Sequence, residues 1–184
     1  MRCDGTGSTD AERIYHDTEW GVPLRDEGAL FELLVLRGAQ AGLAWRTVLA
    51  KRAAYRRAFL DYDIDAVAAL DDAAMARIAL DRGLIRHRLK LASVRINARA
   101  VQAMRRTDGA FGDFLWSFVD GRTIVNLFRR DDPLPSRSSR SDRMSDALRR
   151  RGFRFAGTAI CYALMQSAGL VDDHQVGCFR RERE

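Results

Sequence analysis

The chain has 184 residues, of which 47% are hydrophobic and 30% charged; this excludes a disordered chain and suffices for one domain with its own core. Lysine and arginine together number 31 against 25 acidic residues, so the formal net charge at pH 7 is +6. Lys51 and Lys90 are the only lysines. A GC-rich coding sequence explains such an arginine excess as well as a phosphate-binding surface does, so the charge is only weak support for a nucleic-acid partner.

The cysteines and the N-terminus indicate where the protein works. The cysteines are Cys3, Cys161 and Cys178, an odd number and too few for a disulfide scaffold. The polar, glycine-rich N-terminus does not resemble a secretory signal, and no apolar run reaches the roughly 18 residues of a membrane span. We therefore expect a cytoplasmic protein with no membrane partner.

Helices are predicted along most of the chain, because alanine, leucine and arginine dominate and strand-like alternation is scarce. The first predicted helix spans 27–36, with Asp26 as its N-cap. The next five span 45–59, 65–70, 72–80, 87–106 and 111–119. A helix that ends near Arg150 and an apolar helix over 157–169 complete the prediction of a single all-α domain over residues 1–184.

Some of the predicted turns carry expectations of their own. Gly83 is expected to adopt a positive φ at the C-terminal end of the 72–80 helix. The segment 131–141 combines two prolines with serine and arginine, which predicts a loop. Ser141 or Asp142 is then expected to cap the helix that follows.

The two ends of the chain carry a pattern of metal ligands. Cys3 and His16 lie near the start, and His174 and Cys178 form an H-x3-C pair near the end. Together they supply two cysteines and two histidines, the usual set of a closed structural zinc site. The spacing alone leaves open that Cys3 is an isolated surface thiol and that the histidines are ordinary polar residues. Cys161 lies in an apolar stretch and is interpreted as a core residue.

Three aromatic residues lie close to glycine and proline turns, namely Tyr15, Trp20 and Trp45. Each of them suits the core, and the alternative is a slot in which a flat base stacks, an interaction worth roughly 1–3 kcal/mol per base. The segment 72–90 reads as a helix, the turn GLIRHRLK and a second helix. Such a turn can present backbone N–H groups and positive charge to a phosphate, or it can be an ordinary helical hairpin with solvated charges.

Several long stretches in the same order resemble the 3-methyladenine DNA glycosylase I family, a branch of the helix-hairpin-helix glycosylases. They are YHDTEWGVP at 15–23, QAGLAWRTVL at 40–49, GLIRHRLK at 83–90, FLWSFVDG at 114–121, and the run at 141–178 that ends in HQVGC. The resemblance covers nearly the whole chain. It implies a helical bundle and an enzyme of base excision repair that hydrolyses the N-glycosidic bond of alkylated purine, with 3-methyladenine as the expected base.

The resemblance also implies roles for individual residues. Structural zinc would join the terminal segments 1–25 and 170–184, with ligands at Cys3, His16, His174 and Cys178. The base pocket would be formed by Tyr15, Trp20 and Trp45. A helix-hairpin-helix element over about 72–106 would grip the DNA backbone through Gly83, Leu84, Ile85, Arg86, His87, Arg88 and Lys90.

Three positions depart from the family pattern. The family glutamate that hydrogen-bonds the flipped base, in a LEGQQAG-like motif, falls on Arg37, and a family pocket tyrosine falls on Glu12. Either Glu12 pairs with Arg37 across the pocket entrance, or Glu12 takes over recognition of the base. Leu89 stands where the family often has glycine, which would hinder close approach of the hairpin to a phosphate.

The implied partners are double-stranded DNA with a flipped damaged base and the free alkylated purine as product, and the implied state is a monomer. A 3-alkyladenine is cationic and leaves readily, so the enzyme has to extrude and stack it more than to protonate it. Because of Arg37, two alternatives remain open, which are a divergent glycosylase for another lesion and an inactive DNA-binding homologue.

Overall fold

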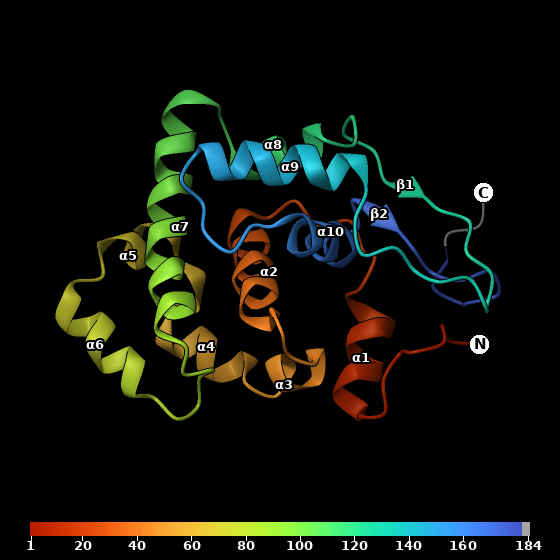
Figure 1. The fold of residues 1–184 in the computed structure, drawn as a ribbon, viewed down its shortest axis with the longest axis horizontal. Coiled ribbons are helices and arrows are strands. Elements are labelled where there is room, and N and C mark those ends of the chain that lie inside the picture. The colour runs from red at the N-terminus through yellow and green to blue at the C-terminus, as the bar shows by residue number, and fades with distance from the viewer. Residues whose placement is uncertain (182–184) are drawn as a thin grey trace.

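The computed structural model describes residues 1–181. Its helices lie around two central helices, α2 (Glu27–Gln40) and α10 (Thr158–Ser167) (Figure 1). Within this range the first half of the chain forms mostly short helices, of which α2 is the longest. They are α1 (Asp10–Thr18), α2 (Glu27–Gln40), α3 (Trp45–Leu49), α4 (Arg52–Ala58), a 3-10 turn (Leu60–Tyr62), α5 (Ile64–Ala69) and α6 (Asp72–Leu80). The second half contains α7 (Arg88–Thr107), α8 (Phe111–Ser117), β1 (Ile124–Val125), α9 (Ser139–Arg150), α10 (Thr158–Ser167) and β2 (Val171–Asp172).

Helix α2 lies at the centre of the molecule. Every residue from Leu30 to Ala39 is buried, as expected for a helix that is apolar on nearly all sides. It packs against α10 and α7, and α9 covers α10 from the other side (Figure 1). Two charged residues, Glu32 and Arg37, are buried in this central helix together with the leucines. A charge inside a core needs partners, so these two residues mark where the helix does more than fill space.

The predicted helices are confirmed in place, with differences at their ends. Asp26 caps α2 as predicted, and α2 continues to Gln40, one turn beyond the predicted end. The predicted helix 45–59 is divided into α3 and α4. The N-cap of α9 is Ser138, whose side chain accepts from the Ser141 backbone in a reciprocal capping box, so the prediction of Ser141 or Asp142 as the cap was wrong.

Helix α1, the 3-10 turn and the strands β1 and β2 were not predicted. Helix α1 begins with a capping box between Thr9 and Glu12, so the polar N-terminus does contain a local signal for a helix start. Strands β1 and β2 pair in parallel, Ile124 with Val171. The described chain is therefore mostly helical but not purely α. The sequence did not predict the strands, because two-residue strands depend on a distant partner and leave no periodic pattern.

The two ends of the described chain lie together at one side of the molecule (Figure 1). The backbone N–H of Phe179 donates to the Met1 carbonyl at 2.9 Å, and that of Asp4 donates to the Gln175 side chain at 2.6 Å. Gly169 brings the chain after α10 against residues 22–23, where a Cβ would lie 2.5 Å from Pro23 N. These contacts place α1 and the C-terminal segment beside each other.

No helix within residues 1–181 is long and apolar enough to cross a membrane.

Candidate functional site

A cavity of about 200 Å³ opens where α1, α2 and α3 meet the N-terminal segment and the end of α10. It is smaller than a pocket for a drug-sized ligand, which starts near 300 Å³, and it suits a single heterocycle. Its lining includes five residues that the sequence singled out for a base pocket, Glu12, Tyr15, Trp20, Arg37 and Trp45. The rest of the lining is Cys3, Asp4, Gly5, Thr6, His16, Leu134 and Gln166.

The three aromatic residues of the cavity have different surroundings. Tyr15 is buried on α1, and its ring lies 5.1 Å from that of Trp45 at the start of α3, with the planes at 56°. The indole N–H of Trp45 is buried without a hydrogen-bond partner in the described structure. Trp20 lies edge-on against His174, with 4.6 Å between ring centroids. Tyr15 and Trp45 thus form one wall of the cavity, and Trp20 joins the cavity to the histidines.

Arg37 is the buried charge of this cavity. Its Nε donates to Ser167 Oγ at 2.8 Å, its Nη1 to Gln40 Oε1 at 2.8 Å and its Nη2 to Tyr15 Oη at 3.0 Å. Its Cζ lies 3.6 Å from the Trp45 ring centroid, a stacking distance. Burial lowers the pKa of Arg37, and Tyr15 offsets part of that effect, but a guanidinium remains charged in proteins.

Glu12 does not pair with Arg37, so the first of the two hypotheses for this position was wrong. Its carboxylate accepts from the Thr9 hydroxyl at 2.9 Å and from the Ser8 backbone at 3.1 Å. Burial raises the pKa of Glu12, but the hydrogen bonds from Thr9 and Ser8 outweigh it and hold the pKa below its usual range. The carboxylate is held by the cap of α1 because that partner is local. Recognition of a base by Glu12 stays a prediction.

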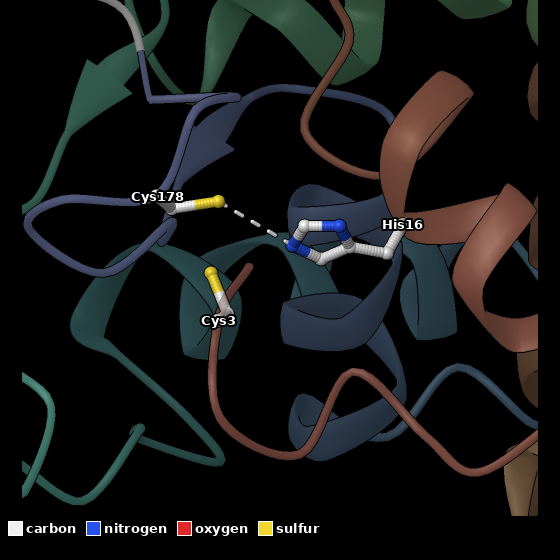
Figure 2. A group of neighbouring side chains, drawn as sticks. All are labelled: Cys3, His16 and Cys178. Atoms are coloured by element: carbon white, nitrogen blue, oxygen red, sulfur yellow. Dashed lines mark hydrogen bonds between the residues drawn. The ribbon is translucent and has the colours of Figure 1, made fainter. Parts of the chain in front are cut away.

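Cys3, His16 and Cys178 converge from both ends of the chain (Figure 2). One ligand atom from each lies within 4.8 Å of the others, and His16 Nε2 is 3.6 Å from Cys178 Sγ. The His16 Nδ1 faces Asp17 Oδ1 at 2.8 Å, which leaves Nε2 directed at the cysteines. The geometry thus joins three of the four predicted ligands directly.

His174, the fourth predicted ligand, lies beside this cluster. Its ring centroid is 5.1 Å from that of His16, and its Nδ1 faces Asp172 Oδ1 at 2.7 Å. Its Nε2 is buried and has no hydrogen-bond partner in the described structure. Cys161 lies apart on α10, where its thiol donates to the Ala156 carbonyl, which confirms its interpretation as a core residue.

The turn 81–87 joins α6 to α7, and its residues differ in what they present. The side chains of Arg86, His87 and Arg88 are exposed, whereas Leu84 is buried. Lys90 is also buried, and its ammonium donates to the carbonyls at the end of α2, 2.9 Å from Ala39 O and 2.6 Å from Ala41 O. The prediction that the Lys90 side chain contributes to the DNA-binding charge was therefore wrong.

Gly83 does not have the expected positive φ, and Asp81 is the C-cap of α6. The glycine is instead required by a close approach, since a Cβ would lie 3.0 Å from Ala54 Cβ and from Asp81 Oδ1. Leu89 is exposed at the first turn of α7, where it stands beside Arg88.

Sequence reasoning missed the residues that support the site. Ser167 and Gln40 hold the Arg37 guanidinium, and neither residue type signals such a role in a sequence. Glu32, on the same helix as Arg37, binds Arg52 at 2.8 Å and Arg56 at 2.7 Å. A single glutamate among the leucines of α2 was the available signal, because a buried acid is rarely left without a cationic partner.

The chain is similar in sequence to known methyladenine glycosylases. A sequence profile of the methyladenine glycosylase family matches residues 6–181. DNA-3-methyladenine glycosylase 1 of Escherichia coli is 45% identical over 177 residues, which are 96% of this chain and 95% of that protein. The DNA-3-methyladenine glycosylase of Haemophilus influenzae is 44% identical over 177 residues, with 96% of each chain covered.

Solved structures agree in fold. A crystal structure of 3-methyladenine DNA glycosylase I superposes with a TM-score of 0.95 at 44% identity, covering 99% of this chain and 100% of that one. The enzyme of Staphylococcus aureus, solved to show how it recognises 3-methyladenine, gives a TM-score of 0.95 at 30% identity over 100% of this chain and 97% of that one.

The fold and the aromatic cavity together define a helical enzyme of the DNA glycosylase class. The chain belongs to the methyladenine glycosylase family, which confirms the resemblance seen in its sequence.

Proposed function

We propose that this protein is a DNA N-glycosylase that removes alkylated purine bases from DNA in base excision repair. The cavity between Tyr15, Trp20 and Trp45 carries this proposal, because it has the size of one base and is lined by these three aromatic side chains. Its relatives are named for 3-methyladenine, which makes this base the reference substrate. Because the proposed substrate is DNA, the protein would act in the compartment that holds the DNA. A cytoplasmic location stays our prediction.

In the proposed reaction the damaged nucleotide leaves the duplex, its base enters the cavity and the N-glycosidic bond is cleaved. Water adds to the sugar, and the free base leaves with the bonding electrons. Extrusion costs a few kcal/mol and is least costly for a damaged pair, so part of the selectivity arises before the base is bound. A purine alkylated at N3 is already cationic and leaves readily, so the proposed role of the cavity is to hold and stack the extruded base.

The α6–α7 hairpin is the proposed grip on the DNA backbone. Arg86 and Arg88 are exposed in or beside the turn, and Lys90 is not available because its ammonium is bonded to the end of α2. The hairpin would therefore contact phosphate through backbone N–H groups and these two arginines. We further propose that the protein acts as a monomer, since one chain provides both the cavity and the hairpin.

We also propose that Cys3, His16, His174 and Cys178 hold one structural zinc ion. Two features support a fit, namely the unpartnered, buried Nε2 of His174 and the convergence of the other three residues. Asp17 and Asp172 hold the Nδ1 atoms of the two histidines, as carboxylates do for histidines that bind zinc. Zinc bound there would tie the terminal segments together and would fix Trp20 beside the cavity.

Base release from methylated DNA tests the enzymatic proposal. Calf thymus DNA treated with a methylating agent is incubated with the full chain, and the freed purines are separated by liquid chromatography. We expect release of alkylated purine that depends on enzyme concentration and falls strongly in Tyr15→Ala, whereas Arg57→Gln, on the exposed face of α4, serves as the matched control. Folded protein that binds DNA with an abasic site but releases no base would identify an inactive DNA-binding homologue.

Metal content tests the zinc proposal. Protein purified without chelator is expected to contain about one zinc per chain, because a closed four-ligand site is nearly full. Cys178→Ser should lower the zinc content strongly, and Cys161→Ala, which removes a thiol far from the cluster, should not. Less than about half an equivalent in the unmodified chain would contradict the ligand set.

A further inference from the structure

Arg37 has hydrogen-bonding capacity that the protein itself does not use. A guanidinium carries five N–H donors, and three of them are taken by Ser167, Gln40 and Tyr15. One N–H therefore remains on each of the two terminal nitrogens. All three partners are neutral, and Arg37 forms no ion pair within residues 1–181.

The guanidinium lies at the place proposed for a ligand. Arg37 borders the aromatic cavity and also a second cavity of about 410 Å³, between the end of α2 and α10. The group is stacked on Trp45 and fixed from three sides, so its orientation is set before any ligand enters. A base that enters the aromatic cavity would therefore meet a guanidinium that is already fixed in place.

Two kinds of purine present different edges to such a group. A 6-aminopurine offers the donor N6–H₂ beside the acceptor N7. When its amino group faces the guanidinium, two N–H donors point at each other and no hydrogen bond forms between them. A 6-oxopurine offers the acceptors O6 and N7 side by side, which is the pattern that arginine binds with two hydrogen bonds. A carboxylate at the same position would favour the amino group instead.

The buried charge acts in the same direction on every cationic base, so it does not distinguish 3-methyladenine from 3-methylguanine. It does favour a neutral purine over a cationic one, because two like charges repel more strongly away from bulk water. The discrimination between amino and oxo purines therefore comes from the hydrogen bonds of the guanidinium.

We propose that Arg37 makes this protein selective for damaged purines that carry oxygen at C6. This inference rests on the proposed glycosylase function and names its substrate class. Both 3-methylguanine, which is cationic in DNA, and hypoxanthine, which is neutral, present the O6 and N7 acceptors.

Competition within one sample tests the proposal. Methylated DNA contains both 3-methyladenine and 3-methylguanine, and the ratio of their initial release rates is compared with the ratio for Arg37→Glu. We expect the unmodified protein to favour 3-methylguanine, relative to the variant, by about 5- to 140-fold, the value of one two-hydrogen-bond contact. An oligonucleotide with one hypoxanthine forms a second arm, and its cleavage shows whether the base has to be cationic.

The outcomes separate this inference from the function on which it rests. Release of 3-methyladenine with the same ratio in protein and variant would overturn the selectivity of Arg37 and leave the glycosylase function standing. Release of 3-methyladenine by Arg37→Glu alone, with no 6-oxopurine released by the unmodified protein, would overturn it as well. No base release by either protein, both folded, would overturn both proposals.

A control variant and a measurement on the unmodified protein complete the test, and the second stays decisive if the charge reversal impairs folding. Arg25 also lies over a tryptophan, 4.3 Å from the Trp116 centroid and outside the cavity, so Arg25→Gln is the matched control and should leave the ratio unchanged. Binding of free bases to the unmodified protein, followed by tryptophan fluorescence, should be tighter for hypoxanthine than for adenine. Equal or reversed affinities would overturn the proposal without any variant.

Discussion

Replacement of Glu32 by glutamine tests the account of the central helix most directly. The Glu32 side chain is 3% exposed, and it binds Arg52 through Nε at 2.8 Å and Arg56 through Nη2 at 2.7 Å. Arg52 also binds Glu19 at 2.7 Å, so it links α4 to the segment after α1. Glutamine keeps the shape of the side chain but removes the negative charge that two guanidinium groups share.

The expected loss of stability follows from how deeply each partner is buried. Loss of one partner from a fully buried ion pair costs about 3–5 kcal/mol, because the other charge is left unpaired. The Arg56 side chain is 50% exposed, so its share is that of a surface pair, at most about 1 kcal/mol. Arg52 is 21% exposed and keeps Glu19. We therefore expect Glu32→Gln to lower the free energy of unfolding by about 2–3 kcal/mol, somewhat below the fully buried value.

Urea denaturation followed by circular dichroism measures this difference. The matched control is Asp108→Asn, whose partner Arg151 lies at 2.6 Å with side chains 28% and 33% exposed, and its loss should be clearly smaller because surface pairs contribute little. The dependence on urea concentration should stay unchanged, since both variants unfold the same surface. A loss in Glu32→Gln no larger than in the control, or a gain, would refute the view that this network stabilises α2.

The same variant predicts an effect of pH. Burial raises the pKa of Glu32, but hydrogen bonds and charge from Arg56 and Arg52 outweigh it, so the pKa in the folded protein lies below its usual value. A lowered pKa gives stability that is complete above the unfolded value of about 4.3 and is lost as the pH falls through the folded value. The difference between the unmodified protein and Glu32→Gln should therefore be constant from pH 7 to about 5 and shrink below about pH 4.

The remaining predictions concern a buried lysine, an exposed arginine, a glycine and a cysteine. Lys90→Met should cost about 1–3 kcal/mol of stability and leave the salt dependence of DNA binding unchanged, because its ammonium bonds backbone carbonyls. Arg88→Gln should instead reduce the slope of log affinity against log salt by about one. Gly169→Ala should cost at least about 2 kcal/mol, since φ is +68° and a Cβ would lie 2.5 Å from Pro23 N. Cys161→Ala should cost about 1 kcal/mol and keep the zinc content.

Each of these has a contrary result. A smaller salt slope in Lys90→Met would mean that its ammonium reaches DNA after all, and an unchanged slope in Arg88→Gln would remove α7 from the phosphate contacts. An unchanged melting temperature in Gly169→Ala would show that the chain after α10 can move away from residues 22–23. Loss of metal in Cys161→Ala would contradict its place in the core.

Local signals in the sequence predicted the helices well. Asp26 caps α2 and the apolar run after it marks a helix, because both signals depend on residues a few positions apart. Helix ends were predicted less well where a competing cap was available, as at Ser138. The strands β1 and β2 could not be predicted, since residues 124–125 acquire their conformation only from residues 171–172.

The functional site also combines features that local sequence signals predict with contacts that form only after folding. The family resemblance marked Tyr15, Trp20 and Trp45 as a pocket, and all three line the cavity. They could not show that Lys90 is bonded to the end of α2 or that Glu12 is held by the cap of α1, because each contact depends on which backbone groups lie nearest after folding.

The sequence by itself determined that this is a basic, mostly helical protein of the methyladenine glycosylase family with arginine where a carboxylate is expected. These properties follow from composition, periodicity and motifs, which are local. Only the tertiary structure decided what the arginine does. The neutral partners of Arg37 come from α1, α2 and α10, and their convergence on one guanidinium, stacked on Trp45, leaves two donors for a ligand. No local pattern records such a convergence, because it exists only once distant helices have packed together.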